Sequence, residues 1–185
     1  MSVFFSILVK IIKARWIFKF PKKTKILVFD RFWSEYMFNF INKKEVEILF
    51  TRYEEINVPI LIKCLIKRNL SPKSYYKEFI EAVNPKLIIT FIDNAQRFWE
   101  INKITKIKTA FVQTGMRCHL YENNSFGKIF NNKSKKKLYK VNHMFVLNKD
   151  YGKKYNSFIK GNVSIIGSFK SNTFQILKKK KKRRS

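Results

Sequence analysis

The chain has 185 residues, of which 45% are hydrophobic and 16% aromatic, with only 5 glycines and 4 prolines. This composition provides a core for one domain of ordinary size, and it excludes a disordered, fibrous or linker-rich protein. The formal net charge of +28 predicts attraction to a polyanion: nucleic acid, an anionic membrane or a phosphorylated substrate. Codon usage is an equally good explanation, because Lys, Ile, Asn and Phe are abundant and AT-rich codons supply them.

Residues 1–24 mix apolar and aromatic side chains with cations. The apolar run from Val3 to Val9 is shorter than the roughly 20 residues that span a bilayer, and the segment lacks the order of a signal peptide. We favour an amphipathic helix that lies in a membrane interface; the alternative is an ordinary first helix packed on the domain. The first interpretation predicts membrane contacts by Phe4, Phe5, Lys10, Lys13, Arg15 and Trp16.

From residue 25 onward, short apolar runs alternate with helical candidates. The runs are continuously apolar, which is typical of strands buried on both faces, and they predict strands over 25–30, 46–50, 86–92, 108–113, 143–147 and 163–167. Helices are expected over 32–41, 58–69, 71–84, 95–104 and 150–159. Ser71 and Asp150 are cap candidates, and Pro72 suits a first helical position.

This alternation predicts an α/β fold: a single Rossmann-like domain with a mostly parallel sheet, covering residues 25–172. The polar segment 122–137 is expected to be a loop, and the basic tail 173–185 to be disordered. Of the two cysteines, Cys64 lies in an apolar run and is expected to be a buried small hydrophobe. Neither Cys64 nor Cys118 belongs to a metal-binding or disulfide pattern, so we expect a reducing compartment.

Polar residues follow several of the predicted strands. In open α/β sheets, ligands bind outside the carboxyl ends of the strands, so these residues are the candidates for a site: Asp30, Arg31, Asp93, Asn94, Gln113, Thr114, Gly115, Arg117 and His119. Gly115 would let a ligand approach the backbone, and Arg117 would bind a phosphate or carboxylate. Asp93 or His119 is the candidate general base.

Each of these residues also has an ordinary structural explanation. Asp93 and Asn94 would cap the next helix, Gln113 would hold a turn, and His119 would be a surface residue. The cluster as a whole, rather than any one member, indicates a site. The chain has no glycine-rich nucleotide motif, no nucleophile elbow and no metal-ligand spacing, so we expect no cofactor and no metal.

Four segments, quoted "KILVFDRFWSEYMFNFI", "LIITFIDNAQRFWEI", "KTAFVQTGMR" and "HMFVLNKDYGKKYNSFIKGNVSIIGSFKSN", together resemble a known family. They are similar to the N-terminal half of bacterial surface-carbohydrate (O-antigen or capsule, lipopolysaccharide) biosynthesis proteins of the glycosyltransferase B type, over residues 25–172. A similar arrangement occurs in teichoic-acid glycerophosphotransferases, which stay an alternative.

The resemblance implies an acceptor-side domain, as in one half of a B-type glycosyltransferase, located in the cytoplasm at the inner face of the bacterial membrane. Its partners would be a lipid-linked or glycan acceptor, an anionic membrane surface and a donor-binding domain. The catalytic residue would be Asp93 or His119. The residues expected to bind the acceptor are Asp30, Arg31, Asn94, Gln113, Thr114, Gly115 and Arg117.

The donor domain of that family has no counterpart in this sequence. The run Lys178–Arg184 is encoded by adenine-rich codons, which are prone to slippage, so we expect a frameshift and an enzyme that is inactive without its second half. A different class of function is a non-enzymatic basic module that binds anionic membrane or nucleic acid, without sequence specificity, through its ends.

Overall fold

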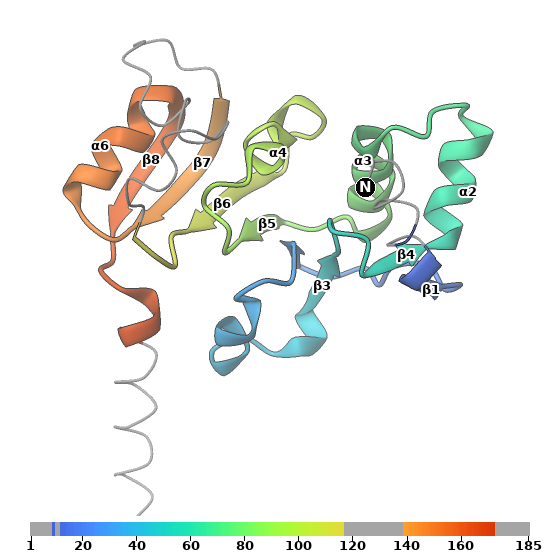
Figure 1. Cartoon of the computed structure of the whole chain (residues 1–185), viewed down its shortest axis with the longest axis horizontal. Helices are drawn as coiled ribbons and strands as arrows, with labels where there is room; N and C mark the ends of the chain where they lie inside the picture. The colour runs from blue at the N-terminus through green and yellow to red at the C-terminus, as the bar shows by residue number, and fades with distance from the viewer. Residues whose placement is uncertain (1–8, 10–11, 117–138, 173–185) are drawn as a thin grey trace, which may run out of the picture.

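A six-stranded sheet, parallel throughout, forms the centre of the protein (Figure 1). The computed structural model describes residues 9, 12–116 and 139–172. Along the sheet the strands run in the order β3 (Val46–Leu49), β2 (Ile26–Phe29), β5 (Leu87–Thr90), β6 (Lys108–Val112), β7 (Tyr139–Val146) and β8 (Ile159–Ile165). The predicted Rossmann-like α/β fold is confirmed, and all six predicted strands are present.

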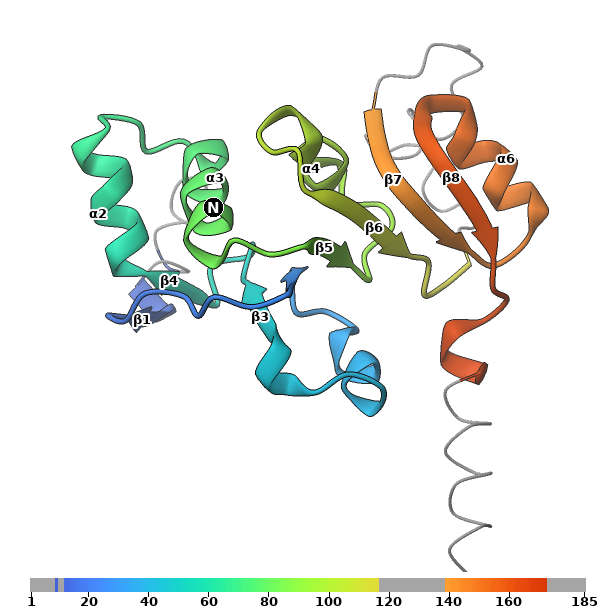
Figure 2. The ribbon, with the colours of Figure 1, turned by 180° about the vertical axis from the view of Figure 1, so that it is seen from behind.

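Three helices cover one face of this sheet: α3 (Pro72–Val83), α4 (Gln96–Trp99) and α6 (Lys149–Phe158). Figures 1 and 2 show them on one side of the strands, with α2 (Val58–Ile66) beyond α3 at the end of the molecule. Three short 3-10 helices lie in the connections: η1 (Ser34–Asn39), η2 (Lys43–Glu45) and η3 (Ile101–Lys103). Between sheet and helices lies the larger core cluster, in which Trp99, Phe111 and Tyr155 are fully buried.

Helix starts follow the expected capping chemistry, with one correction. Ser71 caps α3 by accepting a hydrogen bond from the Ser74 amide at 3.2 Å, and Pro72 is the first helical residue, as predicted. The cap of α6 is Asn148, whose Oδ1 accepts from the Tyr151 amide at 3.0 Å. Asp150 lies in the first turn instead, where a carboxylate is stabilised by the helix dipole.

The opposite face of the sheet carries a smaller cluster, which includes Val28, Met37, Phe91 and Val112. The connection from β2 to β3 runs toward the edge of the sheet that β3 forms, whereas the other connections between successive strands of the sheet run in the opposite direction. The connection from β2 to β3 contains η1. Right-handed crossovers put this connection on the other face from α3, α4 and α6. The two faces of the sheet are therefore covered by different kinds of element.

The N-terminal segment departs from the predicted helix after residue 13, since residues 12 and 13 are helical but residues 15–17 are not. Residues Arg15–Ile17 form strand β1, which pairs in parallel with β4 (Glu55–Asn57). The Arg15 guanidinium forms an ion pair with Glu55, and the Arg15 amide donates to the Glu54 carbonyl at 2.9 Å. Pairing with β4 gives the backbone N–H and C=O groups of Arg15–Ile17 hydrogen-bond partners, which an unpaired extended segment would lack.

Of the predicted membrane contacts, Phe4, Phe5 and Lys10 lie outside the described residues, while Trp16 is 41% exposed. In the part of the chain that the structure describes, no helix has the length and apolar character needed to cross a bilayer.

Cys64 is fully buried in α2, as predicted, and Ser74 Oγ lies 3.8 Å from its sulfur. Burial raises the pKa of the Cys64 thiol, which keeps it in the unreactive protonated form. In a Cys118→Ser background we expect Cys64 to react with Ellman's reagent at pH 8 only after denaturation. Rapid labelling of the native protein would show that α2 opens readily.

Candidate functional site

The strand order changes direction next to β2. The chain crosses from β2 outward to β3 and then returns past β2 to β5, so the boundary between β2 and β5 is the topological switch point of the sheet. In open α/β sheets the ligand crevice lies at such a point, outside the carboxyl ends of the strands. The loop after β2 borders this crevice, and on its other side it meets the loop after β3.

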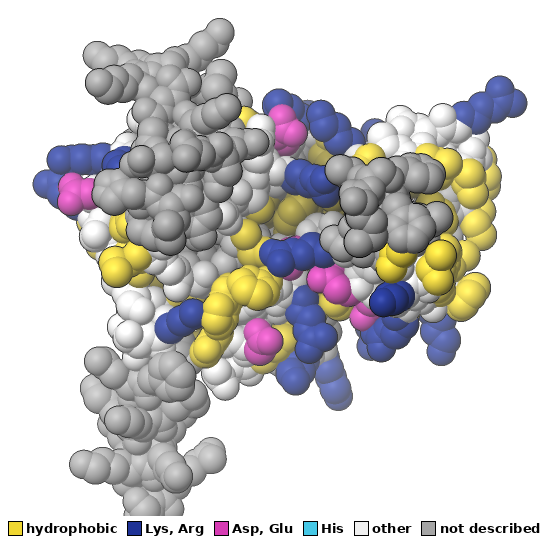
Figure 3. All heavy atoms as spheres, viewed as in Figure 1, with side chains coloured by type: hydrophobic (Ala, Val, Ile, Leu, Met, Phe, Trp, Pro, Cys, Tyr) yellow, Lys and Arg dark blue, Asp and Glu magenta, His cyan; other side chains and the backbone are white. Residues whose placement is uncertain are grey.

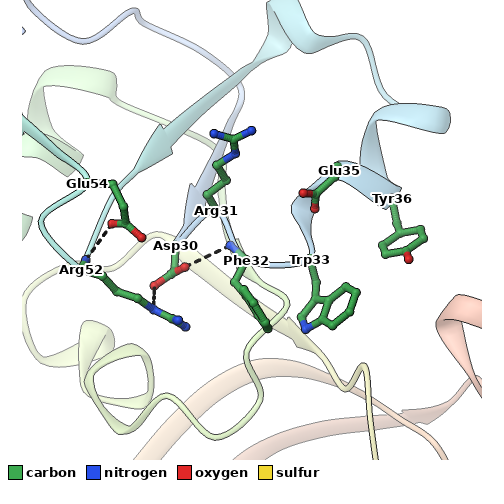
Figure 4. A pocket seen from close by; sticks show the side chains of 8 residues that line it. All are labelled: Asp30, Arg31, Phe32, Trp33, Glu35, Tyr36, Arg52 and Glu54. Atoms are coloured by element: carbon green, nitrogen blue, oxygen red, sulfur yellow. Dashed lines mark hydrogen bonds and ion pairs between the residues drawn. The ribbon is translucent and has the colours of Figure 1, made fainter. Parts of the chain in front are cut away.

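These two loops enclose a hollow of about 450 Å³ (Figure 4). From the loop after β2 and the start of η1 come Asp30, Arg31, Phe32, Trp33, Glu35 and Tyr36, and from the loop after β3 come Arg52 and Glu54. The volume is within the range of small-molecule sites. Two of its residues, Asp30 and Arg31, were predicted as site residues.

The Asp30 carboxylate holds the two loops together. Its Oδ1 accepts from the Phe32 amide at 3.0 Å, and its Oδ2 accepts from Thr51 Oγ1 at 2.7 Å and from Arg52 Nε at 2.9 Å. Only 4% of Asp30 is exposed. In Figure 4 the carboxylate points toward Arg52 and the Phe32 backbone, away from the Arg31 side chain. Contact between Asp30 and an acceptor stays a prediction; the contacts seen are those of a positioning residue.

Backbone strain is concentrated around this hollow. Asp30, Trp33 and Tyr53 have φ values of 74°, 63° and 67°, in the left-handed region that residues other than glycine seldom adopt. Each such residue costs of order 1 kcal/mol or more, and strain of this kind clusters at functional sites. The hydrogen bonds to Asp30 help to hold the loop after β2 in this conformation.

Aromatic rings form one wall of the hollow. Trp33 and Tyr36 are stacked with centroids 5.9 Å apart, and Phe32 meets Trp33 edge-on at 5.0 Å. Beyond them, Phe169 packs edge-on against Tyr36. Phe169 comes from the segment after β8, which turns at Gly167 with a φ of 67°. The same segment places Lys170 Nζ 3.3 Å from the centroid of the Trp33 ring.

Cations surround this aromatic wall. Arg52 lies over the Phe32 ring at 5.1 Å while it bonds Asp30, and its side chain remains 49% exposed. Arg31 is exposed, and its side chain has no hydrogen-bond or ion-pair partner among the described residues. Its carbonyl accepts from the Ser34 amide at 2.9 Å, which fixes the backbone beneath it. The hollow thus combines apolar ring surface with an available guanidinium.

The other predicted residues after β5 and β6 are mostly engaged in the interior. Asp93 is fully buried and accepts a hydrogen bond from Tyr155, and its carbonyl accepts from Trp99 Nε1 at 3.0 Å. Gln113 is also fully buried: its Nε2 donates to the Gly115 carbonyl at 3.0 Å, and its Oε1 accepts from the Leu147 amide at 3.1 Å. The role of Asp93 as general base stays a prediction, and in this structure the carboxylate that would take the proton is fully buried.

Of the remaining members of the predicted cluster, Thr114 is buried, Asn94 and Gly115 are partly buried, and two lie outside the described residues. Thr114 donates to the Phe91 carbonyl at 3.2 Å, Asn94 is half-buried, and a Cβ added to Gly115 would meet nothing within 4 Å. Arg117 and His119 lie outside the described residues. Among the described residues, no three His, Cys, Asp or Glu side chains gather in a way that could hold a metal ion.

The sequence prediction missed Arg52 and Glu54 in this hollow. A signal was available, since "TRYEE" follows the second predicted strand, and the rule about carboxyl ends applies to it as well. Glu54 lines the hollow, and its Oε2 accepts a hydrogen bond from the Arg52 amide at 3.2 Å. Trp33 and Tyr36 were placed in a helix rather than in a site.

One comparison with known proteins gives a match. Residues 110–185, less than half of the chain, match a family described as "putative O-antigen biosynthesis protein". The described part of this region contains most of β6 together with β7, α6 and β8. No curated protein and no solved structure matches the chain. The C-terminal part of the chain therefore associates it with O-antigen biosynthesis.

Proposed function

We propose that this chain is the acceptor-side domain of a B-type glycosyltransferase in surface-carbohydrate biosynthesis, and that the hollow after β2 and β3 binds the acceptor. The family match over residues 110–185 supports the pathway, and the parallel α/β sheet is the fold expected of such a domain. The observation that carries the proposal is the exposed Arg31, which has no partner among the described residues and lines the same hollow as the aromatic wall.

This combination suits a sugar joined to a phosphate. The C–H face of a pyranose ring is apolar and packs on aromatic side chains such as Phe32, which is 49% exposed. A guanidinium binds phosphate through two parallel N–H donors, and Arg31 has both available. Lys170 and Arg52, which already lie over rings of the wall, would add positive charge. An acceptor sugar carried on a lipid phosphate has both of these chemical features.

The transfer step also requires a base for the acceptor hydroxyl. Glu35 lines the hollow, is exposed, and has no hydrogen-bond or ion-pair partner in the described part of the chain. Its carboxylate would take the hydroxyl proton while the oxygen attacks the anomeric carbon of a donor sugar and the nucleoside diphosphate leaves. The donor would be held by a second domain that faces this edge of the sheet.

We expect Arg31→Gln to weaken binding of farnesyl-diphospho-N-acetylglucosamine, a short-chain probe, by about 10- to 100-fold. Loss of a charge-assisted hydrogen bond of about 1.5–3 kcal/mol gives this range. Titration calorimetry on the whole chain measures it. The matched control is Arg97→Gln, because Arg97 is also exposed but lines a different hollow, with Ser71 and Pro72.

Equal losses in the two variants would mean that the probe responds to total charge, which favours the basic-module alternative over an acceptor site. Complementation gives a second readout. In a bacterial host that carries a deletion of this gene, the Arg31→Gln gene should fail to restore the O-antigen ladder while the Arg97→Gln gene restores it. If deletion of the gene leaves the O-antigen ladder unchanged, the proposed role in O-antigen biosynthesis is wrong.

A further inference from the structure

Large apolar side chains are exposed at one end of the molecule. Among the described residues, twelve large hydrophobic side chains are exposed, and eight of them lie in residues 12–20 and in or just after α2. They are Ile12, Trp16, Phe18, Phe20, Ile62, Leu65, Ile66 and Leu70, and we call them the apolar end. Figure 3 shows hydrophobic atoms gathered at the end where α2 lies. A concentration of this kind marks an interaction surface, whereas scattered exposed residues do not.

Helix α2 is the clearest part of this surface. Its sequence, VPILIKCLI, contains one charged residue in nine, and a helix that is apolar on all sides is normally covered on all sides. One face packs on the domain through Ile60 and Cys64, both fully buried. The other face presents Ile62, Leu65 and Ile66, which are 49%, 50% and 76% exposed and lie on one face at spacings of three and four residues.

The N-terminal strand continues the apolar surface alongside α2. Trp16 of β1 shares an apolar groove of about 390 Å³ with Leu61 of α2 and Leu70. After the strand, the Phe20 ring lies under the Lys63 Nζ of α2, at 5.1 Å. Figures 1 and 2 show β1, β4 and α2 side by side at this end.

Cations whose side chains form no ion pair with a described residue accompany the apolar end. None of the following makes an ion pair with a described residue: Lys13, Lys19, Lys22, Lys23, Lys63, Arg68 and Lys73. Two of the nearby carboxylates are neutralised, since Glu55 pairs with Arg15 and Glu78 pairs with Lys67. The surface is thus both apolar and positively charged.

We infer that the apolar end docks on an anionic lipid bilayer, with Ile62, Leu65 and Ile66 entering the boundary between headgroups and acyl chains. Membrane-surface elements combine apolar side chains with Lys and Arg in this way. A second copy of the chain would bring the same cations face to face. Single-stranded nucleic acid could stack on the exposed rings of Phe18 and Phe20, but it would leave the aliphatic face of α2 in water. This inference is independent of the acceptor site.

Vesicles of phosphatidylcholine and phosphatidylglycerol at 3:1 provide the test. We expect the double variant Ile62→Gln/Ile66→Gln to bind about tenfold more weakly, or worse, in a flotation assay, because two apolar side chains no longer leave water. Ile165→Gln is the matched control: Ile165 is 58% exposed on β8. The variants share every cation of the chain, so a difference between them isolates the apolar contribution.

Depth of insertion gives an independent readout. Brominated lipids should quench tryptophan fluorescence on binding, and Trp16→Phe should remove most of the quenching, because Trp99 is buried and Trp33 lies in the hollow after β2. Equal vesicle binding by the double variant and the Ile165→Gln control would overturn the inference. So would binding to pure phosphatidylcholine as strong as to the anionic vesicles, or quenching that Trp16→Phe leaves unchanged.

Discussion

Replacing Gly161 by alanine should destabilise the protein by about 3 kcal/mol, among the largest effects of a single methyl group in this chain. Gly161 lies in β8 next to the irregular register between β7 and β8 at Lys140 and His143. A Cβ at this position would stand 1.7 Å from the Val141 carbonyl oxygen and 2.9 Å from its carbonyl carbon. These are backbone atoms, so no side-chain rotation relieves the clash and β7 must separate from β8.

Gly115→Ala is the matched control for this variant. A Cβ there meets nothing within 4 Å, so the substitution should be neutral or slightly stabilising, by up to about 1 kcal/mol, through the loss of freedom in the unfolded chain. Urea unfolding followed by circular dichroism measures both variants. Similar midpoints for the two would show that β7 and β8 are not in close contact at Gly161.

The strands were predictable because their signal is local. Buried parallel strands are continuous runs of apolar residues, and each of the six runs became a strand. β7 starts at Tyr139 rather than at residue 143, because a polar residue of the segment before residue 143 forms hydrogen bonds with the neighbouring strand. Asn142 Oδ1 accepts from the Thr109 amide at 2.9 Å, and this long-range bond across the sheet is invisible in the local pattern.

The helix predicted over 95–104 shows how tertiary packing overrides periodicity. Trp99 and Ile101 are both 1% exposed, but residues two apart point to different sides of an α-helix. The chain therefore ends α4 at Trp99 and continues as the 3-10 helix η3. The pairing of β1 with β4 was missed for a related reason: each strand has three residues, and their partnership depends on contacts distant in sequence.

The rule about carboxyl ends led to the edge of the sheet where the hollow lies, but it did not give the contacts that the residues there make. Asp93 and Gln113 follow their strands as predicted, yet both side chains are fully buried and bonded inside the protein. Whether a polar side chain turns inward depends on partners such as Tyr155, 62 residues away along the chain. Sequence spacing alone cannot distinguish a buried polar bond from an exposed ligand contact.

Asp30→Ala should destabilise the protein by about 3 kcal/mol and should also abolish acceptor binding. The substitution removes the acceptor for the Phe32 amide, the Thr51 hydroxyl and Arg52 Nε, and an unsatisfied buried donor costs about 1–3 kcal/mol. The half-exposed Arg52 contributes less than a buried partner would. Alanine at a φ of 74° adds about 1 kcal/mol of backbone strain.

Asp30→Asn separates the charge from the backbone strain. Asparagine tolerates the left-handed conformation but offers one acceptor oxygen to three donors, so we expect a loss of about 1–2 kcal/mol. Glu35→Gln changes a carboxylate in the same hollow that has no described partner and should shift the free energy of unfolding by less than about 0.5 kcal/mol. If Asp30→Asn proves as stable as the Glu35→Gln protein, the carboxylate does not hold the loops after β2 and β3. The strained conformation of Asp30 and Trp33 must then be maintained by the packing of the aromatic wall alone.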